Sequence, residues 1–295
     1  MLTTWQNIPL HINPVAFTIG DLSIRWYSLG YLLAFLTIYF ILKRRFVFTD
    51  NIIPVRSKAS DRAPSGFTFE QLESILLFSF LGALMGGKIG YIIFYDWANF
   101  IANPLLSFWP FSNGIFIGLY GMSFHGGLLG ALFFGWLACK KYSLNFWEVA
   151  NFIVLAFPLG YFWGRIGNFM NGELYGRITE SGIGMHFSDL DASLNILRHP
   201  SQLYEAFGEG LLLFLILLHF SKKKIWANNM LPLFLIFYGL IRFVIEFFRQ
   251  PDEHLGFIVN WLTMGQVLCI VMIGIGSLLI FNFQFSIFKQ FSSKK

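Results

Sequence analysis

The chain has 295 residues, of which 56% are hydrophobic and only 13% are charged. A soluble domain carries about 25% charged residues, so this composition excludes an ordinary soluble domain and indicates a polytopic membrane protein. The net charge of +5 does not indicate a nucleic-acid partner, because Lys and Arg cluster beside apolar runs. The first 25 residues lack the basic and apolar regions of a signal peptide, so the first apolar run is expected to anchor the chain.

Seven stretches are apolar and long enough, at about 17–25 residues, to be membrane helices. We expect them at approximately 26–42, 72–94, 115–138, 147–165, 204–220, 230–248 and 259–282. The prediction is an all-α integral membrane protein with about seven transmembrane helices in one polytopic domain, residues 1–295. The segment 166–203 is too long for a turn and is expected to form a small periplasmic cap.

The positions of Lys and Arg predict the orientation of the chain. With the N-terminus outside, 14 of them fall in inside segments and 5 in outside segments. Because basic residues favour the cytoplasmic side, we expect the N-terminus outside and the C-terminus in the cytoplasm. The segment 43–71 is basic and contains Pro54 and Pro64, so it is expected to be a cytoplasmic loop.

Polar residues gather at the end of the fourth span, in 164–177. This stretch holds two arginines, two asparagines, one glutamate and four glycines. Ionisable side chains at membrane depth are costly and usually mark a functional path. The alternative is a helix end that frays into an ordinary polar loop.

Other polar residues are expected to meet this stretch in the outer half of the bilayer. The sixth span carries four polar residues with spacings of four, four and three, which places them on one helix face; they are Tyr238, Arg242, Glu246 and Arg249. At about 1.5 Å per residue, His125 in the third span is expected roughly 10–15 Å below the outer surface. Tyr27 opens the first span on the same side. We therefore predict a cavity that also includes Arg165, Asn168 and Glu173.

Each of these features has a structural alternative. His125 could be a core histidine, and Arg242 with Glu246 could be an ion pair that only neutralises charge in the membrane. Lys88 could extend toward the interface or pair with a carboxylate. In the second span, a face of small residues predicts helix packing rather than ligand binding; it consists of Gly82, Gly86 and Gly90.

Arginines near the outer leaflet suit a phosphate group, which guanidinium binds in bidentate fashion. The most abundant phosphate there is the phospholipid headgroup, and a nearby histidine can act as general base at neutral pH. The sequence shows no Ser-His-Asp order, acidic metal cluster or HExxH motif, so we expect no metal or cofactor and a nucleophile that comes from the substrate. A transporter or flippase, and another phospholipid-using transferase, are alternatives.

The stretch 164–176 resembles the signature Gly-Arg-x-Gly-Asn-Phe-x-Asn-x-Glu-x-x-Gly of bacterial prolipoprotein diacylglyceryl transferases. The segments 123–127, 199–205 and 246–252 are also similar to that family, and length and span layout agree from end to end. The chain departs from the family pattern at a few positions, which are Arg25, Ser28 and Lys88.

The resemblance implies transfer of the diacylglyceryl group from phosphatidylglycerol to the lipobox cysteine of a prolipoprotein. The product is a thioether, glycerol phosphate leaves, and the enzyme lies in the bacterial inner membrane with its site toward the periplasm. His125 corresponds to the residue proposed to activate the thiol, and Arg165 and Arg242 to essential arginines of the lipid site. Tyr27, Asn168 and Gly176 correspond to other required positions. Further substrate-binding residues are expected at Asn171, Glu173, Tyr238, Glu246 and Arg249.

Overall fold

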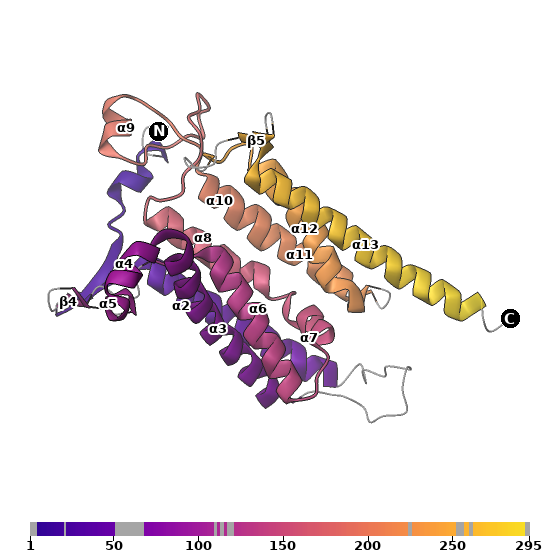
Figure 1. Ribbon diagram of the computed structural model, residues 1–295. Coiled ribbons are helices and arrows are strands. Elements are labelled where there is room, and N and C mark those ends of the chain that lie inside the picture. The colour runs from indigo at the N-terminus through magenta and orange to yellow at the C-terminus, as the bar shows by residue number, and fades with distance from the viewer. Residues whose placement is uncertain are drawn as a thin grey trace. The chain divides into compact units, whose positions relative to one another are not determined.

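The computed structural model describes residues 5–20, 22–50, 68–108, 111–112, 115–116, 121–223, 226–251, 257–259 and 262–292. Its chain forms two compact units. The larger unit contains residues 1–42 and 150–295, and the smaller unit contains residues 43–149. Long helices dominate both units (Figure 1), with three two-stranded antiparallel sheets in the described residues that the all-α prediction did not include.

The larger unit begins with a short helix, η1 (Ile8–His11), and a hairpin of β1 (Val15–Ile19) and β2 (Leu22–Arg25). Its longer helices are α2 (Trp26–Asp50), which continues past residue 42, α8 (Phe157–Met170), α12 (Met230–Ile245) and α13 (Met264–Ser292). A further helix is built from α10 (Ser201–Glu205), the π-helical segment η2 (Ala206–Leu212) and α11 (Leu213–Ser221). The remaining short elements are α9 (Asp189–Ser193), η3 (Ala227–Asn229), β5 (Phe257–Val259) and β6 (Leu262–Thr263).

The smaller unit is built around two long helices, α3 (Phe69–Tyr95) and α6 (Phe124–Lys141). Its short elements are α4 (Trp97–Ala102), α5 (Pro104–Phe108), β3 (Phe111–Ser112), β4 (Ile115–Phe116) and the first residues of α7 (Phe146–Ile153). Thr68 begins α3 with a capping box: its hydroxyl accepts from the Gln71 backbone N–H at 3.2 Å, and the Gln71 side chain accepts from the Thr68 N–H at 2.9 Å.

Within the described residues, four helices are long and apolar enough to cross a membrane, or five if the bent pair α7 and α8 is one span. They match predicted spans 26–42, 72–94, 204–220 and 259–282, and the bent pair matches 147–165. The protein is thus a helical, multi-pass membrane protein. The predicted spans at 115–138 and 230–248 correspond to α6 and to α12, which is a shorter apolar helix, so the total of seven stays a prediction.

Several predicted boundaries are wrong. Residues 115–116 form a strand, and α6 begins only at Phe124, because Gly121 has φ +70° and Ser123 caps the helix. The depth expected for His125 assumed a helix from 115 and loses its basis. Residues 43–50, predicted as loop, continue α2, and residues 51–67 of that loop lie outside the described residues. Finally, α8 extends to Met170, so the cap begins later than residue 166.

Helices α3 and α6 of the smaller unit pack backbone against backbone. A Cβ at Gly86 would overlap the Gly126 carbonyl oxygen, and one at Gly82 would overlap the Gly130 carbonyl oxygen. The Ser123 N–H also donates to the Gly87 carbonyl at 2.9 Å. This confirms the prediction that the small-residue face of the second span serves helix packing.

The larger unit has an apolar core that joins α11 and α12 to residues 154–155, which precede α8. It includes Leu213, Leu217, Met230 and Leu233. Helix α2 approaches α8 closely, since a Cβ at Gly30 would lie 2.9 Å from the Trp163 carbonyl oxygen and one at Gly167 would lie 3.2 Å from the Tyr27 Cα. Helices α12 and α13 run side by side in Figure 1.

Candidate functional site

The face of α8 that carries Arg165 is organised by its own polar neighbours. Arg165 Nε donates to the Tyr161 hydroxyl at 2.7 Å, and its Nη1 donates to Asn168 Oδ1 at 3.3 Å. These residues are four and three positions from Arg165, so they share one helix face. Asn168 Nδ2 in turn donates to Glu173 Oε1 at 2.8 Å. The polar stretch is therefore an ordered network that orients Arg165, not a frayed helix end.

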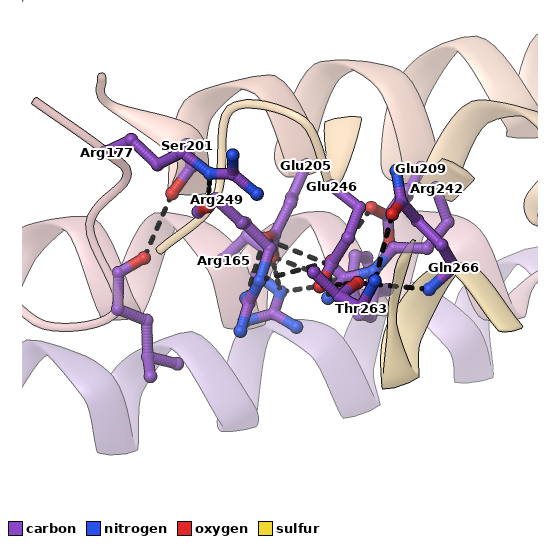
Figure 2. Close-up of polar contacts among 12 residues, drawn as sticks. Arg165, Arg177, Ser201, Glu205, Glu209, Arg242, Glu246, Arg249, Thr263 and Gln266 are labelled. Atoms are coloured by element: carbon purple, nitrogen blue, oxygen red, sulfur yellow. Dashed lines mark hydrogen bonds and ion pairs between the residues drawn. The ribbon is translucent and has the colours of Figure 1, made fainter. Parts of the chain in front are cut away.

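Glu205, at the end of α10, is the central carboxylate of the site and is 0% exposed. Three arginines from two segments of the chain contact it: Arg165 Nε of α8 at 2.6 Å, and Arg242 Nη1 and Arg249 Nη1, in α12 and just after it, at 3.1 Å and 2.8 Å. Figure 2 shows these side chains pointing toward one another. One buried carboxylate thus fixes the spacing of three guanidinium groups.

Two further carboxylates complete the cluster. Glu209 of η2 contacts Arg242 Nη1 at 3.3 Å, and Glu246 contacts Arg242 Nη2 at 2.9 Å and Arg249 Nε at 3.5 Å. The Thr263 hydroxyl donates to Glu246 Oε1 at 3.1 Å. Three arginines therefore balance three glutamates, which is how buried charges are tolerated. We call these six residues the arginine–glutamate cluster; they are Arg165, Glu205, Glu209, Arg242, Glu246 and Arg249.

The segment 171–203 that follows α8, which we call the cap, is tied to the residues after α12 beside this cluster. The Gly176 N–H donates to the His199 carbonyl at 2.8 Å, and the Arg177 N–H donates to the Phe248 carbonyl at 2.9 Å. A Cβ at Gly176 would overlap the Phe248 carbonyl oxygen, so this position admits only glycine. Arg177 Nε also donates to the Arg249 carbonyl at 2.7 Å. The cap therefore holds the backbone of Arg249 in place.

Two other contacts connect the cap to the helices. Gln202 Nε2 donates to the Glu173 carbonyl at 2.6 Å, and the Ser201 hydroxyl donates to the Leu174 carbonyl at 3.1 Å. His199 contacts the Tyr204 hydroxyl through Nδ1 at 3.1 Å, and partial burial lowers the pKa of His199 below its ordinary value.

Comparison with known proteins identifies the chain. The family model described as prolipoprotein diacylglyceryl transferase matches residues 14–282. A phosphatidylglycerol–prolipoprotein diacylglyceryl transferase of Chlorobaculum tepidum is 44% identical over 278 residues, covering 93% of this chain and 91% of the relative. Proteins of the same name from Campylobacter curvus and Rickettsia bellii are 41% and 40% identical, each over 92% of this chain and 94% and 95% of their own. The chain belongs to the prolipoprotein diacylglyceryl transferase family.

The residues that the family model matches, 14–282, include every site residue predicted from the sequence. The structure brings four of the predicted residues into the cluster, namely Arg165, Arg242, Glu246 and Arg249. Arg249 lies beyond the end of α12, not on its helical face as predicted. Glu246, whose partner the sequence left open, contacts both Arg242 and Arg249.

Other predicted residues also lie in the larger unit. Asn168 and Glu173 orient Arg165, and the Tyr238 ring packs edge-on against Tyr161 with centroids 6.3 Å apart. The Tyr27 hydroxyl hydrogen bonds with the Tyr31 hydroxyl at 2.6 Å, and Asn171 follows α8 as its C-cap.

His125 belongs to the smaller unit, where it is exposed in the first turn of α6. Because its side chain is exposed, His125 is not a core histidine of that unit. Its role as base stays a prediction. Lys88 is buried in α3 of the same unit.

Sequence reasoning missed Glu205 and Glu209 as site residues. A signal was present, because they are the only charged residues in the apolar run 205–221 and lie four positions apart. Tyr161 and Thr263 were also missed, since neither stands out from its surroundings. Within the described ranges, no group of three or more His, Cys, Asp or Glu has the arrangement of a metal site.

Proposed function

We infer that this protein transfers the diacylglyceryl group of phosphatidylglycerol to a prolipoprotein, the first step of lipoprotein maturation. Membership of the transferase family supports this reaction. The acceptor is the lipobox cysteine that follows the prolipoprotein signal peptide. The observation that carries the assignment of the site is the convergence of three arginines on Glu205.

The headgroup phosphate binds at the arginine side of this cluster. Among the described residues, Arg165 Nη2 donates no hydrogen bond, so that nitrogen can donate to a phosphate oxygen. Arg242 and Arg249 supply further donors. Guanidinium groups that are already oriented bind phosphate without first losing side-chain freedom.

In the chemical step the acceptor sulfur attacks the glycerol carbon that bears the phosphate ester. A C–S bond forms, the C–O bond breaks, and its electron pair leaves on the phosphate oxygen of glycerol phosphate. The thiol proton passes to a base, for which His125 is our candidate. Arginines that hold the phosphate more tightly as its charge grows stabilise the transition state. Tyr27, Asn168, Asn171, Glu173, Gly176 and Tyr238 shape and orient the site.

We place the protein in the bacterial inner membrane with seven spans, the N-terminus outside and the C-terminus in the cytoplasm. The uneven distribution of Lys and Arg supports this topology. The cluster then lies toward the periplasmic leaflet, where the cap covers it.

The test mixes purified full-length protein, phosphatidylglycerol and a lipobox peptide, and weighs the peptide by mass spectrometry. We expect the peptide to gain the mass of one diacylglyceryl group. A peptide with Ser in place of the lipobox Cys is the matched control and should gain nothing, because a hydroxyl is a weak nucleophile at neutral pH. No mass gain on the Cys peptide, with the protein folded, would contradict the proposed function.

A further inference from the structure

The Arg242 guanidinium is occupied by carboxylates at both of its terminal nitrogens. Nη1 contacts Glu205 Oε1 at 3.1 Å and Glu209 Oε1 at 3.3 Å, and Nη2 contacts Glu246 Oε2 at 2.9 Å. A phosphate that binds Arg242 adds a further anion to a guanidinium that already faces three carboxylates. The headgroup and the carboxylates then share one positive charge.

Glu209 is the carboxylate with the fewest cationic partners. Glu205 also pairs with Arg165 and Arg249, and Glu246 also has Arg249 and a hydroxyl donor. Within the described residues, Glu209 forms one ion pair, in which Arg242 Nη1 donates to its Oε1 at 3.3 Å. Its Oε2 is buried and has no hydrogen-bond donor there. Glu209 therefore has the least positive charge to keep it ionised when an anion shares Arg242.

Glu209 cannot leave the cluster easily, because its backbone is wedged between two helices. It lies in η2 between Gly208 and Gly210. A Cβ at Gly208 would lie 2.9 Å from Ile245 Cδ1 of α12, and one at Gly210 would lie 2.7 Å from Phe162 Cβ of α8. This π-helical turn, a feature often found at functional sites, keeps Glu209 inside. The residue is 1% exposed, so bulk solvent does not reach it to replace Arg242.

A buried carboxylate without a cation is strongly destabilised, whereas its protonated form does not carry that charge. The cluster holds three arginines and three glutamates, and a bound phosphodiester adds one negative charge. One proton on Glu209 restores the balance: three guanidinium groups then face Glu205, Glu246 and the phosphate.

We propose that Glu209 is a charge-compensating residue that is held protonated while an anionic phosphodiester headgroup occupies Arg242. Binding then takes up one proton from water wherever the free carboxyl is ionised. The proposal rests on the proposed function, which supplies phosphatidylglycerol as the anion. The charged and titratable groups around Glu209 come from α8, α10, α12 and α13; they are Tyr161, Arg165, Glu205, Tyr238, Arg242 and Cys269.

The test counts protons during lipid binding. Phosphatidylglycerol is titrated into the full-length protein in detergent by calorimetry, at several pH values from 6 to 10, each in two buffers of different ionisation enthalpy. The wild-type protein should take up close to one proton per lipid at the alkaline end, with Kd rising by up to tenfold per pH unit there. Glu209→Gln should take up almost none and show a Kd that does not change with pH. Glu209→Asp keeps a titratable carboxyl and should restore the uptake.

The outcomes separate this proposal from the proposed function. If the wild-type protein fails to transfer diacylglyceryl to the lipobox peptide, the proposed function fails. If it transfers, but Glu209→Gln takes up as many protons as the wild type, the charge-compensation proposal is overturned. It is also overturned if Glu209→Gln binds no phosphatidylglycerol while Glu209→Asp does, because a neutral amide should substitute for the protonated carboxyl.

Discussion

Helices contact one another in different ways in the two units of this protein. In the smaller unit, α3 and α6 touch through glycines, and their shape sets the approach. In the larger unit, α8, α10 and α12 meet through the arginine–glutamate cluster, and charge sets their approach. The first arrangement tolerates no added atoms, whereas the second tolerates no unbalanced charge. Substitutions in the glycine contact should therefore lower the melting temperature, whereas substitutions in the cluster should lower the rate of transfer.

The largest effect is expected from Arg165→Lys in the cluster. Lysine keeps the charge that Glu205 needs but lacks the guanidinium fork that grips a phosphate. By analogy with loss of one transition-state donor, we expect transfer to slow by on the order of 10²–10³, with an unchanged melting temperature. Peptide mass spectrometry measures the rate, and Arg198→Lys in the cap, whose arginine pairs with Asp191 at 3.2 Å, is the matched control.

The second largest effect is expected from Gly86→Leu, at the glycine contact between α3 and α6. The new side chain would overlap the Gly126 carbonyl, and overpacking of this kind costs about 1–3 kcal/mol or more. We expect a lower melting temperature in detergent. Gly274→Leu in α13 is the control, because no atom lies within 4 Å of a Cβ built there. If Gly86→Leu lost transfer activity at an unchanged melting temperature, close packing of the glycines would not be what holds α3 and α6 together.

A smaller effect is expected from Ser123→Ala at the start of α6. The Ser123 hydroxyl accepts from the Gly126 N–H at 3.3 Å and caps the helix that carries His125. Losing a cap of this type costs typically about 1 kcal/mol. Thermal melting should show a drop that is smaller than that of Gly86→Leu. A drop as large as that of the glycine variant would show that the cap, not the helix contact, dominates this unit.

The smallest effect concerns pH and His199 in the cap. Burial lowers its pKa, so the folded protein binds this proton more weakly than the unfolded chain does. Stability should therefore be fully present above the ordinary histidine range and fall as the pH drops through it. We expect His199→Gln to lose less melting temperature than the wild type between pH 7.5 and 5.5. Equal losses in both proteins would contradict this account of His199.

The sequence predicts the α3 side of the glycine contact, because that side depends on a regular spacing within one helix. The α6 side, which consists of Gly126 and Gly130, was not predicted. The period of four from Gly82 to Gly90 is enough to place a small face on α3. The same spacing of four allowed an ion pair between Arg242 and Glu246 as one alternative, and the structure shows that contact at the end of α12.

The centre of the cluster could not be predicted in this way. Glu205 contacts arginines that are 40, 37 and 44 positions away, and no local pattern encodes which helices meet there. The start of α6 was mispredicted for a related reason: the apolar run continues through 115–123, and only the backbone at Gly121 and the Ser123 cap show that the helix begins later. The roles of the site residues in substrate binding stay predictions.

The central claim is that the arginine–glutamate cluster binds the phosphatidylglycerol headgroup. Native mass spectrometry of the full-length protein counts bound lipid directly, for the wild type, the double variant Arg165→Lys with Arg242→Lys, and Arg198→Lys. We predict one retained phosphatidylglycerol on the wild type and on Arg198→Lys, and none on the folded double variant. Equal retention of the lipid by all three proteins would contradict the claim.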